Sequence, residues 1–314
     1  MQNQIMVSML ALAGGLALSS AAFAQTEIIP PGWKTCPHCL TLEQQLHEAT
    51  YNPPGMPFNP RDLSGVWNSR PNVDKPGAPI IDTVHDSFAK DMAGTGVAPP
   101  NFPGLTPYGK QLFDATLTDF KPPEGTRVTN SKDPMLKCDP LGWPRWFTYN
   151  YGIEFVMLPD RVLQFIEWGH TWRTIWTDGR KLPENPPEPR FMGWAVGHWE
   201  PDNTFIVESN GYDDRSWVSE AGNFMTKPGQ KGWGLNGWPH TSEMRIVERW
   251  KRTSYGILEG QLTVIDPKVY LKPWVTDVVR HTLLPDTEIW EYFCVPSDSE
   301  YYNERVLKPS NGAK

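Results

Sequence analysis

Prolines and glycines interrupt this chain so often that long helices are excluded from most of it. The 314 residues include 32 prolines and 26 glycines, which recur along the whole sequence. Proline lacks a backbone N–H donor and disfavours a helical conformation in the residue before it, and glycine destabilises the interior of a helix. The sequence therefore favours short extended segments that are joined by turns.

Residues 153–294 have the pattern of consecutive short strands. Apolar and β-branched residues alternate with polar ones, and the dipeptides at 159–160, 169–170 and 178–179 are turn signals. The expected strands are 62–67, 154–158, 161–168, 171–177, 194–200, 204–208, 243–252, 257–265, 275–283 and 289–294.

This series of strands predicts a mainly β fold. We expect an antiparallel meander that closes, or nearly closes, into a lipocalin-like barrel, because an open meander would leave unpaired edges. A β-sandwich is the alternative. Short helices are expected before the strands, at 40–49 and at 105–115, where Thr106 is suited to cap the helix and Pro107 to begin it. Long inserts at 181–190 and 210–240 are expected at the barrel mouth, where loops often carry function.

The N-terminus has the pattern of a cleavable signal peptide. Residues 5–18 are mostly apolar or small, and residues 22–24 (Ala-Phe-Ala) match the motif that signal peptidases accept. The apolar stretch is shorter than the about 20 residues of a membrane span. We expect a signal peptide at 1–24, a proline-rich segment at 25–60 and one β-rich domain at 61–314. The mature protein would then be periplasmic or secreted, with no stable membrane span; an uncleaved anchor is the alternative.

Four cysteines indicate disulfide bonds in an exported protein, with three possible connectivities. They are Cys36, Cys39, Cys138 and Cys294. We favour a local Cys36–Cys39 bridge and a Cys138–Cys294 bridge that ties the start of the β-region to its last strand. The C-P-H-C motif at 36–39 is similar to the redox motif of thioredoxin-fold enzymes, but no βαβ unit surrounds it. Leucine follows the motif where a haem attachment site has histidine, and a zinc site lacks an evident fourth ligand.

Four blocks of the sequence resemble those of a group of exported, functionally uncharacterised bacterial proteins that are rich in β-structure. The blocks lie at 138–145, 172–180, 192–199 and 266–274, and the likeness covers roughly residues 60–295. The resemblance implies an exported β-rich domain and implies no particular reaction.

Charge and motif content argue against several classes of function. The net charge is −7 and lysines and arginines do not cluster, so nucleic acid is not an expected partner. The sequence has no serine nucleophile elbow, no dinucleotide-binding fingerprint and no phosphate loop, so we expect no organic cofactor. The seven histidines lack the spacing of metal ligands, and no metal is expected; a site built from the distant His170, His198 and His240 remains open.

The sequence contains 15 tryptophans, which have two interpretations. Most would fill a β-rich core, and some would line a pocket for a flat or apolar ligand. The candidates for ligand binding are Trp168, Trp172, Trp194, Trp238 and Trp250.

Candidate residues for proton transfer come from the expected turns and strands. His170 lies in a turn between two aromatic-rich strands and His240 ends a Gly/Trp-rich loop, and the ordinary pKa of histidine suits acid–base work. Alternation at 244–250 places Glu248 on the apolar face of its strand, which should point inward. Arg173 shares a face with Ile175, so a buried ion pair with Glu248 or Glu167 is expected. Such a pair is more often structural, but it could also bind a carboxylate or phenolate ligand.

These observations support two hypotheses. The first is a periplasmic enzyme of the hydrolase, lyase or isomerase type that acts on a small hydrophobic or aromatic molecule through His170, His240, Glu248 and Arg173. The alternative is a non-catalytic binding protein for a similar ligand, and the sequence alone does not decide whether the protein is an enzyme.

Overall fold

The computed structural model describes residues 55–69, 101–116, 132–148, 151–222, 236–284, 288–289 and 293–297, all within the compact unit His38–Lys314. The expected signal peptide, the Cys36–Cys39 bridge and the expected helix at 40–49 lie outside the described residues. No helix in these ranges has both the length and the apolar character needed to cross a membrane.

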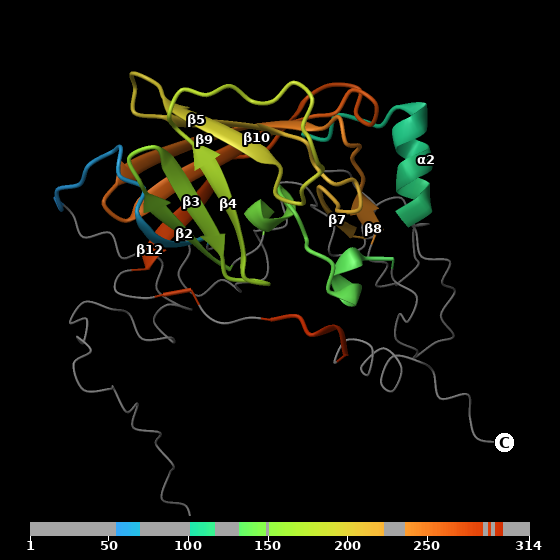
Figure 1. Ribbon diagram of the computed structural model, residues 1–314, viewed down its shortest axis with the longest axis horizontal. Helices are drawn as coiled ribbons and strands as arrows, with labels where there is room; N and C mark the ends of the chain where they lie inside the picture. The colour runs from blue at the N-terminus through green and yellow to red at the C-terminus, as the bar shows by residue number, and fades with distance from the viewer. Residues whose placement is uncertain are drawn as a thin grey trace, which may run out of the picture. The chain divides into compact units, whose positions relative to one another are not determined.

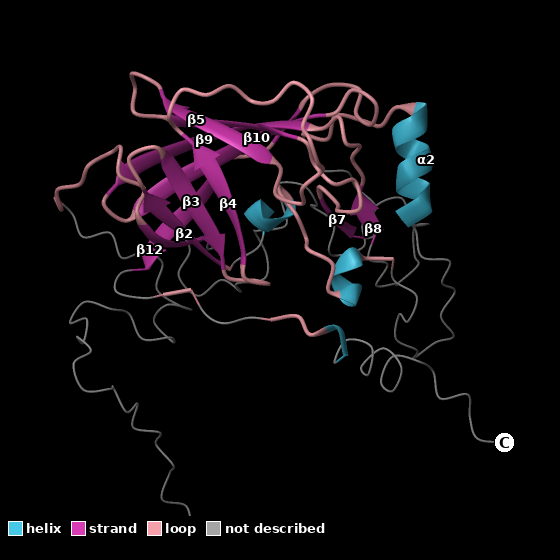
Figure 2. Cartoon of the chain, in the orientation of Figure 1, coloured by secondary structure: helices cyan, strands magenta, loops and turns pink. Residues whose placement is uncertain are grey.

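The described part of the chain is mainly β-structure, with one α-helix and two 3-10 helices (Figures 1 and 2). The strands are β1 (Gly65–Ser69), β2 (Gly152–Met157), β3 (Arg161–Ile166), β4 (Thr171–Trp176), β5 (Trp194–Trp199), β6 (Phe205–Asn210), β7 (Ser219–Gly222), β8 (Asn236–Trp238), β9 (Arg245–Ser254), β10 (Ile257–Ile265), β11 (Trp274–Val275) and β12 (Val279–Leu284). The helices are α2 (Pro107–Thr116), η3 (Pro134–Lys137) and η4 (Arg145–Thr148).

Nine of these strands form a closed barrel. The order is β10-β12-β1-β2-β3-β4-β5-β6-β9, and β9 pairs again with β10 to complete the ring. The two-residue strand β11 adds to β10 along part of its length, and β7 and β8 form a separate small sheet. The expected mainly β barrel is confirmed, and closure removes the free edges that a sandwich would retain.

One pair in the ring departs from the antiparallel meander. Strands β4 and β5 are parallel and share only two residue pairs, Ile175 with Ala195 and Trp176 with Val196. Parallel neighbours cannot be joined by a tight hairpin, because the chain must first return to the end from which it started. Residues 177–193 make this return. They contain four prolines, at 183, 186, 187 and 189, so a helix cannot form there as it does in most parallel crossovers.

Alternation along the strands separates a packed interior from the outer surface. On β9, the buried residues Ile246, Glu248 and Trp250 alternate with Arg249 and Lys251, which are exposed. The expected inward face of this strand is therefore confirmed.

Aromatic side chains from the segment before β2 help to fill the interior. Phe147 of η4 lies with its ring centroid 5.7 Å from that of Trp250 and 5.8 Å from that of His281, and Phe155 lies 5.2 Å from Trp250. Burial of rings of this size is the main source of core stability.

The helix α2 begins as the sequence predicts. Pro107 is its first residue, and the Oγ1 atom of Thr106 accepts the N–H of Gly109 at 2.9 Å. This bond satisfies one of the N–H groups that a helix leaves unpaired at its start.

The disulfide between Cys138 and Cys294 is present, as expected. Cys138 ends η3, and neither Phe293 nor Cys294 lies on a strand, so the expected strand at 289–294 does not reach Cys294. Its central residues, 290–292, lie outside the described residues. The expected insert at 210–240 also contains two strands, β7 and β8, which pair antiparallel with each other.

Candidate functional site

A buried ion pair joins β4 to β9, two strands that β5 and β6 separate in the barrel. Arg173 on β4 donates from Nη1 to Oε1 of Glu248 and from Nη2 to Oε2, both at 2.6 Å. The Arg173 side chain is 2% exposed and that of Glu248 is 0% exposed. The sequence predicted this pair, and its bidentate geometry matches the planar fork of the guanidinium to the carboxylate.

The remaining hydrogen-bonding groups of the pair are also engaged. The Nε atom of Arg173 donates to Oε1 of Gln164 at 2.6 Å, and the indole Nε1 of Trp250 donates to Oε2 of Glu248 at 2.9 Å. The guanidinium carbon lies 3.9 Å from the ring centroid of Trp143. A ligand would have to break these bonds to reach either charge, so the pair is structural in this state.

The other partner considered for Arg173 lies elsewhere. Glu167 follows β3, whose inward face consists of the alternate residues Val162, Gln164 and Ile166. The Oε2 atom of Glu167 accepts the backbone N–H of Gly152 at 2.9 Å. Burial raises the pKa of this carboxyl, and the Gly152 bond lowers it in part. Gln164, which the sequence pattern did not identify, is therefore the polar side chain of β3 that bonds to the Arg173–Glu248 pair.

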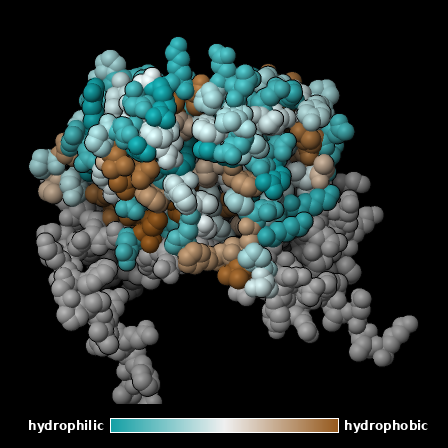
Figure 3. All heavy atoms as spheres, viewed as in Figure 1, coloured by the Kyte–Doolittle hydropathy of each residue, from teal (hydrophilic) through white to brown (hydrophobic). Residues whose placement is uncertain are grey.

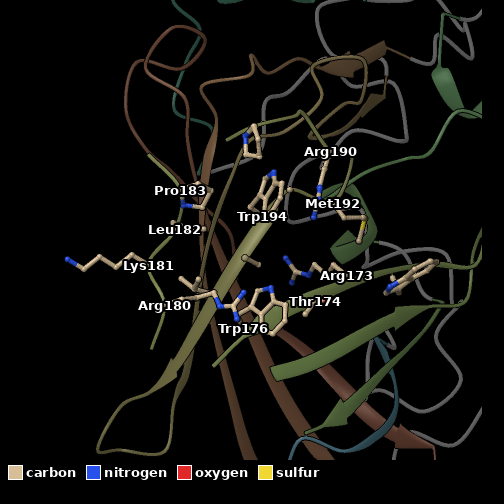
Figure 4. Close-up of a pocket in the computed structure, with 15 residues that line it drawn as sticks. Arg173, Thr174, Trp176, Arg180, Lys181, Leu182, Pro183, Arg190, Met192 and Trp194 are labelled. Carbon is tan, nitrogen blue, oxygen red and sulfur yellow. The ribbon is translucent and has the colours of Figure 1, made fainter. Parts of the chain in front are cut away.

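A cavity lies where β4 and β5 run parallel, and we call it the crossover pocket. Its volume is about 500 Å³, a size suited to a small organic ligand. It is lined by Trp172, Arg173, Thr174, Trp176, Arg180, Lys181, Leu182, Pro183, Pro187, Arg190, Met192, Gly193, Trp194, Ala195 and Val196 (Figure 4).

The pocket exists because the return segment 177–193 lies over the outer surface of the barrel. Thr174 and Trp176 of β4, and Trp194 and Val196 of β5, alternate with the buried residues of their strands and so face outward. The insert at 181–190 was expected at the barrel mouth, but it covers these outward residues instead. The prolines of this segment prevent it from forming a helix, so it covers the outward residues as a loop, and the cavity lies between the two.

Hydrogen bonds fix the return segment in place. The Nδ2 atom of Asn210 donates to the carbonyl of Pro183 at 2.8 Å, and the N–H of Arg190 donates to the carbonyl of Gly211 at 2.9 Å. Gly193 has a φ of +66°, and a Cβ atom there would lie 2.8 Å from the Tyr212 ring. The pocket is therefore a preformed part of the fold.

Cations and indole rings are paired inside the pocket. The guanidinium carbon of Arg180 lies 3.5 Å from the ring centroid of Trp176, and that of Arg190 lies 3.5 Å from the ring centroid of Trp194. Figure 4 shows each arginine beside its tryptophan. Trp194 is held further by a bond from its Nε1 atom to the carbonyl of Glu188 at 3.1 Å. Stacking restricts these long side chains and holds their charges at the pocket wall.

Two of the five tryptophans that the sequence suggested for ligand binding, Trp172 and Trp194, line this pocket. Trp238 and Trp250 are fully buried, and Trp238 stacks on Phe113 of α2 at 4.9 Å. Trp168 lies 4.9 Å from Tyr151, beside a different and smaller cavity near the disulfide.

The two histidines suggested for catalysis do not line the crossover pocket. His170 stacks on Phe293 with centroids 4.1 Å apart. His240 is buried: its Nδ1 atom bonds to the Thr241 carbonyl and its Nε2 atom to Oγ of Ser216, both at 3.0 Å. Burial lowers the pKa of His240, with a smaller opposing effect from the Thr241 carbonyl. The four residues suggested for proton transfer therefore do not form one site in the described part of the chain.

Two further ionisable groups lie in the barrel interior near the ion pair. The hydroxyl of Tyr212 bonds to Oγ of Ser209 at 2.5 Å, and burial raises its pKa above the ordinary value. Burial lowers the pKa of His281 to about 4. Both groups are therefore neutral at pH 7, and the sequence interpretation singled out neither of them.

The sequence pattern did not identify most residues of the pocket wall, among them Trp176, Arg180, Lys181 and Arg190. A usable signal was the alternation at 172–176, which puts Trp172 and Trp176 together on one face of the strand. The pairing of that face with the insert could not be anticipated, because it depends on the parallel β4–β5 contact.

Comparison of the chain with models of protein families, with curated proteins and with solved structures gives no match. Within the described ranges, no three His, Cys, Asp or Glu side chains group so as to hold a metal ion, so a site built from His170, His198 and His240 gains no support. The geometry of the crossover pocket is therefore the basis on which we infer a function.

Proposed function

We propose that this protein binds a small aromatic molecule in the crossover pocket and does not transform it. The observation that carries the proposal is the composition of the pocket wall. Three indole rings, Trp172, Trp176 and Trp194, line a cavity of about 500 Å³, and the lining includes no histidine and no carboxylate. Flat apolar surfaces of this kind favour flat apolar ligands.

The same composition disfavours the enzyme hypothesis. General acid–base catalysis needs a group whose pKa lies near the working pH and which reaches the reacting atom. The titratable groups of the pocket wall are arginines and a lysine, and the hydrogen bond that Arg180 donates to Asp178 raises the pKa of Arg180 further above its ordinary value. Arg173 and Glu248 bond to each other and to neighbouring side chains, and His170 and His240 lie outside the pocket.

We propose further that the protein acts in the periplasm or outside the cell after removal of residues 1–24. The pattern of a signal peptide supports this proposal. A disulfide that joins Cys138 to Cys294 is compatible with it, because such bonds persist mainly in oxidising compartments.

Binding can be tested by titrating the protein with a panel of small aromatic compounds, neutral and charged. Tryptophan fluorescence and calorimetry should reveal saturable one-to-one binding, and chromatography of the recovered compounds should find them unchanged. Conversion of a bound compound would instead favour the enzyme hypothesis.

Trp172→Ala is the informative variant, since this side chain is 60% exposed and its loss should leave the fold intact. We expect it to weaken binding about tenfold or more, the loss that removal of a stacked ring produces. Tyr108→Ala, at an aromatic residue of α2 that is 48% exposed, is the matched control and should bind normally. If no compound binds, or if Trp172→Ala and Trp194→Ala both bind as the parent does, the proposal is wrong.

A further inference from the structure

We propose that the crossover pocket selects an anionic aromatic ligand, an aryl carboxylate, over its neutral counterpart. This inference rests on the proposed function and adds the charge of the ligand to it. The pocket wall contains Arg173, Arg180, Lys181 and Arg190 and no acidic side chain. The chain as a whole has a net charge of −7, so this concentration of positive charge is a local feature of the pocket.

Arg173 is not the group that would hold the ligand anion. Its Nη1 and Nη2 atoms are bonded to Glu248 and its Nε atom to Gln164, and its side chain is 2% exposed. Its charge is compensated inside the barrel. The available cations are therefore those of the return segment, Arg180, Lys181 and Arg190.

Arg180 and Arg190 each retain a donor for a ligand. Arg180 uses Nε and Nη2 to bond to Asp178, and Arg190 uses the same two atoms to bond to Glu188. Within the described residues, the Nη1 atom of each has no hydrogen-bond acceptor. A bound carboxylate could accept from these atoms without breaking the existing pairs.

The existing pairs also hold the two guanidinium groups in place, and each carboxylate offsets part of the charge of its arginine. The Arg180–Asp178 and Arg190–Glu188 pairs are exposed to water, where mutual attraction between opposite charges is weak. Neither Asp178 nor Glu188 lines the pocket, whereas both arginines do. The guanidinium carbons of Arg180 and Arg190 lie 3.5 Å from the ring centroids of Trp176 and Trp194, and that of Arg161 lies 4.1 Å from the Trp176 centroid. Positive charge is therefore held beside the indole rings of the pocket wall.

Lys181 adds a third cation beside Arg180. Its side chain is exposed, and within the described part of the chain it takes part in no ion pair. An ammonium group with this freedom can turn toward a carboxylate that arrives in the pocket. The pocket therefore combines indole rings for an aryl group with three cations for a negative charge, which is the arrangement that an aryl carboxylate requires.

The test compares 2-naphthoate with 2-naphthamide, which have the same ring system and nearly the same shape but differ in charge. Affinities are measured by calorimetry on the full chain at pH 7, at low and at high salt. We expect the carboxylate to bind about tenfold more tightly than the amide at low salt. This preference should shrink at about 1 M salt, where exposed charges are screened.

Three pocket variants and one control locate the preference. Arg180→Gln, Lys181→Gln and Arg190→Gln should each reduce the carboxylate affinity severalfold and leave the amide affinity nearly unchanged. Arg249→Gln removes an arginine from a similarly exposed ion pair with Glu200 outside the pocket and should preserve the preference. Because Lys181 takes part in no ion pair among the described residues, its variant remains informative if either arginine variant is unstable.

Each outcome bears on a different claim. A preference that disappears in the pocket variants and survives in Arg249→Gln supports the inference. Equal affinities for acid and amide, or a preference that no pocket variant reduces, would overturn it and leave the proposed function intact. If neither naphthalene compound nor any other aromatic compound binds, the proposed function fails and this inference fails with it.

Discussion

Breaking the ion pair between Arg173 and Glu248 should be one of the most damaging small changes that this fold can suffer. In Glu248→Gln, the guanidinium of Arg173 would keep its charge in an interior where its side chain is 2% exposed. Removal of one partner of a buried pair typically costs about 3–5 kcal/mol, because the other charge is left uncompensated. That is a large part of the about 5–15 kcal/mol by which proteins are stable.

The double variant Arg173→Met with Glu248→Leu should cost much less than the two single changes together. It removes both charges and leaves only Gln164 Oε1 and Trp250 Nε1 without their bonds to the pair. Unsatisfied buried groups of this kind cost about 1–3 kcal/mol. The two single changes would sum to about 6–10 kcal/mol if they were independent, so the cycle should reveal a coupling of several kcal/mol.

Urea denaturation, followed by tryptophan fluorescence and circular dichroism, measures these costs. Glu200→Gln is the matched control, because its partner Arg249 is 47% exposed and an exposed pair contributes at most about 1 kcal/mol. A cost of less than about 1 kcal/mol for Glu248→Gln, or a double variant that costs the full sum of the single ones, would contradict this role of the buried pair.

Two further predictions concern stability. Burial lowers the pKa of His281 to about 4 in the folded protein, whereas the unfolded chain has the ordinary value of about 6.5, so the unfolded state binds the extra proton first. This contribution to the free energy of unfolding is thus complete above about pH 6.5, and about 3 kcal/mol of it is lost as the pH falls toward 4. In a His281→Phe variant, the free energy of unfolding should change less with pH over that range. The Cys138–Cys294 bond spans a sequence separation of 156, and Cys294→Ser should lower the free energy of unfolding by about 5 kcal/mol on the chain-entropy model. A Cys294→Ser protein whose urea midpoint equals that of the parent would contradict this value.

The sequence alone determined the local structure of most of the barrel. Strand β10 was predicted at the residues where it is found, and the inward position of Glu248 followed from alternation at 244–250. These properties depend on the alternation of side chains between the two faces of a single strand, and this alternation can be read from the local sequence. The pairing of Arg173 with Glu248 could also be proposed, because a charge that is buried in a small core needs a partner of opposite charge.

The tertiary structure alone decided where a ligand could bind. The crossover pocket depends on the parallel contact between β4 and β5, on the path of residues 177–193 over the outer surface, and on the bonds that hold that path. Nothing in the local pattern distinguishes a parallel neighbour from an antiparallel one, because both present the same alternation of side chains. His170 and His240 looked suitable for catalysis for the same reason, since residue type and turn position do not reveal which surfaces will meet.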